Sequence, residues 1–209
     1  CVVRESEPSK GDNLVTCWGS HLLSGFLGDR TRTKQATPTD VPELAGAVEI
    51  AVGAQHVCGR IGGDVVCFGN NLNRQLGATE PRYLRPGRAS PSGLTDAVAL
   101  SAGSRHTCAI RKTGGVTCWG ARTIKDSGVR SIDELSDIAQ IAAGSFHTCA
   151  LRTNGEVLCW GNDDSGQLGR GASGRVSRPM RLDGLDDAVQ LAVGHFHSCA
   201  RRRNGAVAC

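Results

Sequence analysis

The chain has 209 residues, enough for one large domain or two small ones, and its 28 glycines set against three tryptophans and one tyrosine favour many short strands over long helices. Its net charge is +4 with acidic and basic residues interspersed, so neither a nucleic-acid partner nor attachment to an anionic membrane is indicated. No stretch reaches the roughly 18 consecutive apolar residues of a membrane helix, so we expect no membrane insertion.

Segments of alternating apolar and polar residues, each bounded by two cysteines and broken by a turn, recur along the chain and read as β-hairpins. Positions directly opposite each other on antiparallel strands lie within the Cα distance that a disulfide bridges. Ten cysteines is also an even number that few cytosolic proteins of this size carry. We therefore predict five disulfides: Cys1–Cys17, Cys58–Cys67, Cys108–Cys118, Cys149–Cys159 and Cys199–Cys209.

The turns of these hairpins follow from the cysteine spacing. Counting inward from Cys58 and Cys67 leaves Gly62-Gly63 as a two-residue turn, and counting inward from Cys149 and Cys159 leaves 153–155 as a three-residue loop ending in Gly155. In this register Cys149, Leu151, Val157 and Cys159 share one face of the sheet, and Leu158 and Trp160 lie on the other. A sheet that is apolar on both faces needs neighbours on both sides.

A repeat organises the whole chain. Cys17, Cys118 and Cys159 are followed by Trp-Gly and Cys67 by Phe-Gly, and these cysteines with Cys209 are spaced by 50, 51, 41 and 50 residues. Before each hairpin, a small-apolar strand ends in Gly and leads into His-x-Cys, with histidines at His56, His106, His147 and His197. The segments 74–77 and 166–169 carry Gln-Leu-Gly, of which 25–28 is a degenerate copy.

This periodicity predicts an all-β fold, a β-propeller of four-stranded antiparallel blades with about four blade-equivalents present. We expect one repeat domain over 1–209, with hairpin-bearing repeats starting near 1, 46, 96, 137 and 187, the last incomplete. A β-solenoid or a row of separate hairpins is the alternative architecture.

The segment from Ile141 to Asn162, followed by Gly166-Gln167-Leu168-Gly169, resembles the repeat of the regulator of chromosome condensation family. The resemblance extends over nearly the whole chain. It implies a propeller usually of seven blades of roughly fifty residues each, so that we expect this chain to be a segment of a longer protein. Cysteines at both ends of every hairpin are similar to those of secreted and envelope-associated bacterial versions, whereas nuclear guanine-nucleotide exchange implies a reducing compartment.

Two other roles for the cysteines remain open. His147, Cys149 and Cys159 share a hairpin face and would give a Cys2His zinc set, although zinc normally takes a fourth ligand and no Cys-x-x-Cys pair supplies it. Cys1 would bear lipid in a bacterial lipoprotein, although Cys1-Val2-Val3-Arg4 stands in the repeat register of Cys149. We therefore expect no metal and no cofactor.

No sequence pattern indicates catalysis. A histidine present in every repeat favours a structural hydrogen bond over catalysis, although the additional His195 offers a surface metal contact. Nothing resembles a nucleophile elbow, a phosphate loop or a metalloprotease helix, so we predict that the chain is not an enzyme.

Arginines cluster in the outer segments of the repeats, where neighbouring blades would place them side by side. They would form a partner-binding basic band of Arg82, Arg85, Arg88, Arg170, Arg175, Arg178 and Arg181. The sequence favours ordinary solubilising charge over this band, because acidic residues lie close by in the sequence.

The sequence thus favours a secreted, periplasmic or cell-surface binding propeller whose loops contact a protein or glycan partner. The alternatives are a guanine-nucleotide exchange or chromatin-binding propeller inside the cell, and a structural subunit of a surface assembly.

Overall fold

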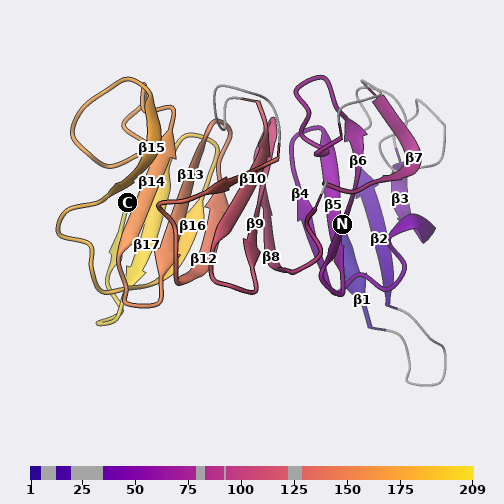
Figure 1. Cartoon of the computed structure of the whole chain (residues 1–209), viewed down its shortest axis with the longest axis horizontal. Helices are drawn as coiled ribbons and strands as arrows, with labels where there is room; N and C mark the ends of the chain where they lie inside the picture. The colour runs from indigo at the N-terminus through magenta and orange to yellow at the C-terminus, as the bar shows by residue number, and fades with distance from the viewer. Residues whose placement is uncertain (6–12, 20–34, 79–82, 92, 122–128) are drawn as a thin grey trace.

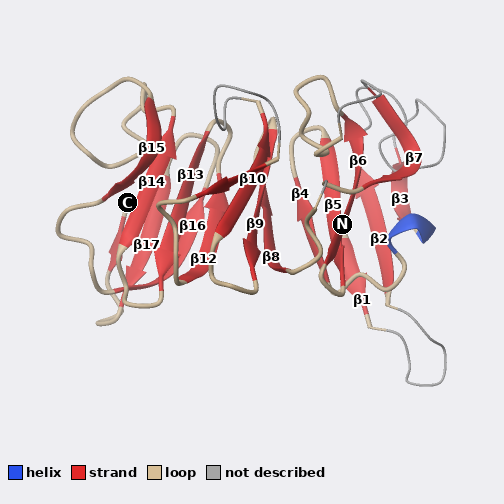
Figure 2. Cartoon of the chain, in the orientation of Figure 1, coloured by secondary structure: helices blue, strands red, loops and turns tan. Residues whose placement is uncertain are grey.

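The structure, a computed structural model, describes residues 1–5, 13–19, 35–78, 83–91, 93–121 and 129–209, with the backbone alone for residues 35 and 83–89. Within these ranges the chain forms five antiparallel sheets, which we call blades I to V in chain order. Figure 1 shows them side by side, from blade I at the right to blades IV and V at the left. Apart from one 3-10 turn, η1 (Pro42–Leu44), the described elements are strands (Figure 2). No helix among them is long and apolar enough to cross a membrane.

The strands of each blade follow one another along the chain. Blade I holds β1 (Val2–Arg4), β2 (Leu14–Gly19) and β3 (Gln35–Asp40), and blade II holds β4 (Glu49–Val52), β5 (His56–Ile61), β6 (Asp64–Asn70) and β7 (Tyr83–Ala89). Blade III holds β8 (Ala97–Ala102), β9 (His106–Arg111), β10 (Val116–Gly120) and β11 (Arg130–Ile132), and blade IV holds β12 (Ile138–Ala143), β13 (His147–Arg152), β14 (Val157–Gly161) and β15 (Val176–Arg181). Blade V holds β16 (Ala188–Val193), β17 (Ser198–Arg202) and β18 (Val207–Ala208).

The first strands of successive blades meet along one line. β4 contacts β8, β8 contacts β12, and β12 contacts β16, so these strands form the inner edge of the stack. Blades II, III and IV then run outward through four neighbouring antiparallel strands. This arrangement confirms the predicted β-propeller of four-stranded blades and excludes a row of separate hairpins.

The hairpin register agrees with the sequence. Cys58 lies opposite Cys67, Cys108 opposite Cys118 and Cys149 opposite Cys159. Each of these pairs is a disulfide, as are Cys1–Cys17 and Cys199–Cys209, so the predicted pairing is confirmed. At the turns, Gly155 has φ of 96° and Gly62 has φ of 62°, the positive values that these short loops require.

The disulfides of blades II, III and IV lie inside the cores between blades. Cys108 and Cys118 are fully buried and belong to the same apolar cluster as Leu158 and Trp160 of blade IV. Cys58 and Cys67 are equally buried and pack with Trp119 of blade III. The sulfurs of one blade and the tryptophan of the next therefore fill the interfaces between blades II and III and between blades III and IV. Both faces of a hairpin are used, as the alternating pattern predicts.

The position of the last disulfide is different. Cys209 is exposed and Cys199 is half-buried, because among the described residues no sheet covers that face of blade V. Cys199–Cys209 and Cys108–Cys118 span the same sequence separation of 10 residues. The two pairs thus differ in burial but not in loop length.

This difference gives a matched stability test. Replacing Cys199 and Cys209 together by Ala should lower the free energy of unfolding by roughly 3 kcal/mol, the contribution of closing a short loop. The double variant Cys108→Ala, Cys118→Ala should lose about 1–3 kcal/mol more, because it also leaves a cavity between blades III and IV. Urea unfolding measures both variants. Equal losses would contradict a packing role for the buried sulfurs.

Candidate functional site

The candidate site lies at the end of the blades that we call the loop face. This face consists of the turns 53–56, 103–106, 144–147 and 194–197, together with the connections 71–78 and 162–175 that follow β6 and β14. In Figure 1 the connection from β14 to β15 loops out above the strands at the upper left.

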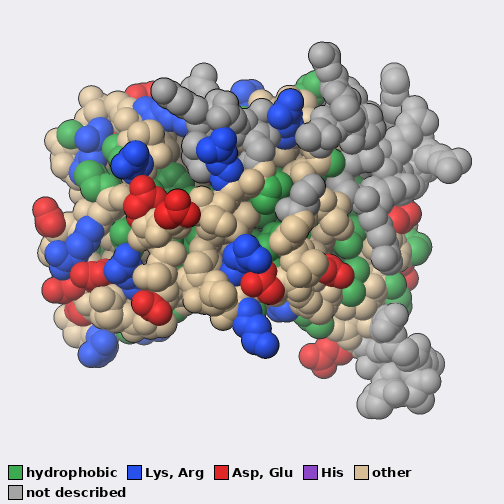
Figure 3. Space-filling view, viewed as in Figure 1, with side chains coloured by type: hydrophobic (Ala, Val, Ile, Leu, Met, Phe, Trp, Pro, Cys, Tyr) green, Lys and Arg blue, Asp and Glu red, His purple; other side chains and the backbone are tan. Residues whose placement is uncertain are grey.

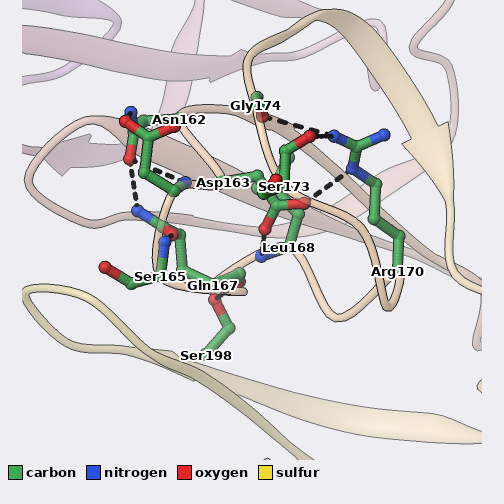
Figure 4. Close-up of polar contacts among 10 residues, drawn as sticks. Asn162, Asp163, Ser165, Gln167, Leu168, Arg170, Ser173, Gly174 and Ser198 are labelled. Carbon is green, nitrogen blue, oxygen red and sulfur yellow. Dashed lines mark hydrogen bonds and ion pairs between the residues drawn. The ribbon is translucent and has the colours of Figure 1, made fainter.

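The connection after β14 is held by its own polar side chains (Figure 4). Buried Asp163 accepts hydrogen bonds from the Leu168 amide at 2.8 Å and from Arg170 Nε at 2.6 Å. Gln167 donates to Asn162 Oδ1 at 2.7 Å and accepts from the Ser165 amide at 2.9 Å. These bonds satisfy the Asp163 charge and fix the loop before any partner arrives.

The connection after β6 has the same design without the charges. Asn71 accepts from the Leu76 amide at 3.1 Å, and Gln75 accepts from the Asn73 amide at 3.0 Å. Where the later loop has Arg170, this loop has Ala78, whose carbonyl accepts from Asn71 Nδ2 at 3.1 Å. The loop after β14 therefore contains a buried carboxylate together with its arginine, whereas in the loop after β6 the side-chain amide of Asn71 takes the place of both. This symmetry indicates a structural loop and not a catalytic carboxylate.

The repeated histidines link each blade to the next. His56 Nε2 lies 2.7 Å from Thr107 Oγ1, and Thr107 Oγ1 lies 3.0 Å from the Gln75 carbonyl. Because the single hydroxyl proton goes to the carbonyl, His56 Nε2 must donate to the hydroxyl. This chain of bonds thus ties a histidine of blade II, through a hydroxyl of blade III, back to the connection after β6 of blade II.

The same link recurs along the stack. His106 Nε2 lies 2.8 Å from Thr148 Oγ1, and His147 Nε2 lies 2.9 Å from Ser198 Oγ. Ser198 donates to the Gln167 carbonyl at 2.9 Å. The hydroxyl residue directly precedes the first cysteine of the next hairpin. The repeated histidines therefore have the structural role that their repetition indicates.

Close packing around these histidines excludes a larger residue at the preceding glycine and disfavours the protonated form of the ring. A Cβ at Gly144 would clash with the His147 ring and approach the Gly194 carbonyl, which explains the glycine before each Gly-x-x-His turn. Burial lowers the pKa of His56 to about 3 and the pKa of His106 and His147 to about 4. All three rings are neutral at physiological pH.

A hollow of about 720 Å³ opens on the loop face between blades III, IV and V. Arg105, Phe146 and Phe196 reach it from equivalent positions of the three blades, directly before each histidine, and Asp164 and Arg175 line it from the connection after β14. Phe146 is 41% exposed and Phe196 is 49% exposed, and the Arg105 guanidinium lies 5.6 Å from the Phe146 ring centroid. The residue before each histidine varies between repeats, and this variation was the only feature of the sequence that pointed to the hollow. Our sequence interpretation did not use it.

The predicted basic band is only partly described. Arg82 lies outside the described residues, and the side chains of Arg85 and Arg88 on β7 are likewise not described. Three others form ion pairs: Arg170 with Asp163 at 2.6 Å, Arg181 with Glu156 at 3.1 Å and Arg178 with Glu134 at 3.8 Å. Arg175 lies at the hollow. Figure 3 shows basic and acidic side chains intermixed over the visible face, so the described arginines form no single-sign band there.

The alternative zinc set is not available in this structure. The sulfurs of Cys149 and Cys159 are joined to each other, and a disulfide offers no thiolate. His147 Nε2 is engaged with Ser198. The additional His195 packs edge-on against Phe196, with ring centroids 4.4 Å apart.

Family models match most of the blades that carry this geometry. Two models of the regulator of chromosome condensation (RCC1) repeat match the chain, one over residues 97–121 and 138–167 and the other over residues 154–201. Residues 97–121 and 138–201, in blades III to V, are therefore similar to RCC1 repeats. Among curated proteins it is similar to Protein pim1 of Schizosaccharomyces pombe, at 30% identity over 124 residues, which are 56% of this chain and 22% of that protein.

Solved structures share the same fold. Yeast RCC1 (Prp20), solved with Kap60, has a TM-score of 0.80 and 22% identity over 95% of this chain and 52% of its own. Human WBSCR16 has a TM-score of 0.78 and 21% identity over 91% of this chain and 53% of its own. The ectodomain of the Physcomitrella patens receptor kinase CR4 has a TM-score of 0.64 and 24% identity over 99% of this chain and 51% of its own. These identities establish the fold alone, and the chain spans about half the length of these structures.

The histidine links between blades give a stability prediction. Thr107→Val keeps the side-chain shape but leaves buried His56 Nε2 without its hydroxyl partner, and should lower the free energy of unfolding by about 1–3 kcal/mol. The Gln75 carbonyl loses one of two donors, because it still accepts from Trp119 Nε1 at 2.8 Å. Thr117→Val is the control, because buried Thr117 Oγ1 has no partner among the described residues. It should cost nothing or stabilise slightly. Urea unfolding decides, and equal losses from both variants would contradict the link.

The neutral histidines predict a pH dependence. Below the ordinary histidine pKa of about 6.5 the unfolded chain binds protons that the folded chain does not, so the free energy of unfolding should fall as pH falls from about 6.5 to about 4. The loss is on the order of 3 kcal/mol for each buried histidine. Urea unfolding at several pH values measures the slope.

Two variants separate these histidines from other titrating groups. His106→Gln retains a donor toward Thr148 but cannot be protonated, so it should flatten the slope. His195→Gln, at an exposed position, should leave the slope unchanged. A wild-type stability that stays constant from pH 6.5 to pH 4.5 would contradict the account.

Proposed function

We propose that the chain is a binding propeller that works outside the reducing cytoplasm and presents its loop face to a protein or glycan partner. The observation that carries this proposal is the burial of the disulfides between blades. Cys58, Cys67, Cys108, Cys118, Cys149 and Cys159 are each 0% exposed within the cores that join successive blades. In a reducing compartment these cross-links would not form as the chain folds, and the cores would lack them.

The loop face supports the binding part of the proposal. Rigid connections surround a hollow that exposes two phenylalanines and an arginine, and aromatic and arginine side chains are the types that contribute most to binding. The hydrogen bonds of Asp163 and the histidines are satisfied within the fold, so these groups hold the framework. We assign them no catalytic step.

Similarity to solved proteins bears on the choice of compartment. The CR4 ectodomain has the same fold, which supports use of this propeller outside the cell. Prp20p of Saccharomyces cerevisiae has also been solved, with study of its binding to Gsp1p and histones; it has a TM-score of 0.79 and 24% identity over 92% of this chain and 52% of its own. Nucleotide exchange or chromatin binding is therefore the second candidate function. It requires that the cysteines survive as thiols in a reducing compartment.

The oxidation state of the cysteines in the source cell separates the two candidates. With an alkylating agent present from lysis onward, we expect no alkylated cysteine before reduction and ten after reduction under denaturing conditions, counted by mass spectrometry. A cytosolic thiol protein from the same lysate serves as the control for complete alkylation. Ten alkylated cysteines before reduction would overturn the extracellular proposal and favour the intracellular one.

A further inference from the structure

The same short turn presents one side chain from each blade to the loop face. In four blades the glycine amide donates to the carbonyl of the histidine three residues later, at 2.9 Å each time: Gly53 to His56, Gly103 to His106, Gly144 to His147 and Gly194 to His197. The backbone of the residue before the histidine is fixed as well. Its carbonyl accepts a hydrogen bond at 2.8–2.9 Å from an amide at the end of the hairpin's second strand, that of Asn70 in blade II, Ala121 in blade III and Asn162 in blade IV. The backbone is therefore constant, and only the side chain varies.

That variable side chain changes in character along the stack. It is Gln55 in blade II, Arg105 in blade III, Phe146 in blade IV and Phe196 in blade V. The last three meet at the hollow of about 720 Å³. Both phenylalanines are partly exposed in this frame, although the chain has only four phenylalanines in all. The exposed part of each ring at the hollow is apolar surface that a partner could cover.

The charge at the hollow favours an anionic ligand. Arg105 is exposed, its guanidinium lies over the Phe146 ring at 5.6 Å from the centroid, and it pairs with no carboxylate among the described residues. Two arginines and one aspartate, Asp164, line the hollow. An arginine stacked on a ring keeps its N–H groups in the plane available for a carboxylate.

The polar groups argue against a sugar. Asn162 Oδ1 accepts from Gln167 and from the Asp164 amide, and Asn162 Nδ2 donates to Asp164 Oδ2 at 2.7 Å. The amide that would bind sugar hydroxyls is thus engaged within the loop. What the hollow offers outward is a guanidinium group beside two aromatic rings.

We propose that this hollow binds an acidic peptide segment of a partner protein, in which a carboxylate side chain adjoins an aromatic or aliphatic one. The carboxylate pairs with Arg105, and the apolar side chain packs against Phe146 and Phe196. This assignment rests on the proposed function, because it names the partner class for the loop face of the same binding propeller.

Selection from a random octapeptide library displayed on phage tests the assignment. On the intact disulfide-bonded chain, we expect enriched peptides to carry Asp or Glu next to an aromatic or aliphatic residue. Their binding, measured with synthetic copies by fluorescence anisotropy, should weaken at least tenfold with Arg105→Gln or with Phe146→Ala, Phe196→Ala. Arg203→Gln is the matched control, since it removes the same charge at an exposed turn after β17 and should leave binding unchanged.

A charge reversal at Arg105 tests the assignment by a change of specificity and not only by a loss of binding. Selection on Arg105→Glu should enrich Lys or Arg next to the apolar residue in place of Asp or Glu. The free energy of unfolding of each variant should match that of the wild type, because the changed side chains are exposed. An unchanged consensus on Arg105→Glu, or basic peptides selected by the wild type, would overturn the assignment.

A glycan array run in parallel separates this inference from the proposed function. Glycan binding that requires Phe146 and Phe196, without an acidic peptide consensus, overturns the peptide assignment and leaves a binding propeller. Absence of both peptide enrichment and glycan binding overturns the peptide assignment and counts against binding at the loop face.

Discussion

A disulfide between the two strands of a hairpin, buried against the next blade, is the constraint on which this structure depends. Cys108 and Cys118 fix the register of β9 and β10, and their sulfurs pack under Trp160 of blade IV. A register shift by one residue would turn both the sulfurs and the apolar side chains to the wrong face. The cross-link therefore fixes pairing within a blade and fills the core between blades at the same position, in a chain with few large aromatic side chains.

The hydrogen bonds of the histidines between blades specify how neighbouring blades align. The bond from His56 to Thr107, and from Thr107 to the Gln75 carbonyl, is satisfied only when blade II and blade III are correctly aligned. Misaligned blades would leave a buried imidazole and a buried carbonyl without partners, and each has a high desolvation cost. Sulfur packing thus provides the apolar core of an interface, and the histidine link specifies its alignment. Against this constant frame, the residue before each histidine is free to vary, as Arg105 and Phe146 show.

The sequence predicted the local structure well because hairpins are local. The spacing of Cys149 and Cys159 gave the register, the turn at Gly155 and the division of apolar residues between two faces. It did not give the partner of the histidines, although a hydroxyl residue stands before the first cysteine in Thr107, Thr148 and Ser198. That partner lies in the next repeat, about 50 residues away, and only the stacking of blades reveals it. The hollow was missed for the same reason, since Arg105 and Phe146 meet only because two blades lie side by side. Ion pairs between distant segments, such as Arg178 with Glu134, are likewise set by tertiary packing.

Partial reduction under native conditions tests the burial of the disulfides most directly. Dithiothreitol treatment, followed by alkylation and non-reducing peptide mapping at successive times, reports the order in which the bonds open. The account predicts that exposed Cys199–Cys209 is reduced first, and that Cys58–Cys67, Cys108–Cys118 and Cys149–Cys159 are protected until the blades separate. Reduction of all four at one rate in the folded protein, or peptides that link cysteines of different hairpins, would contradict it.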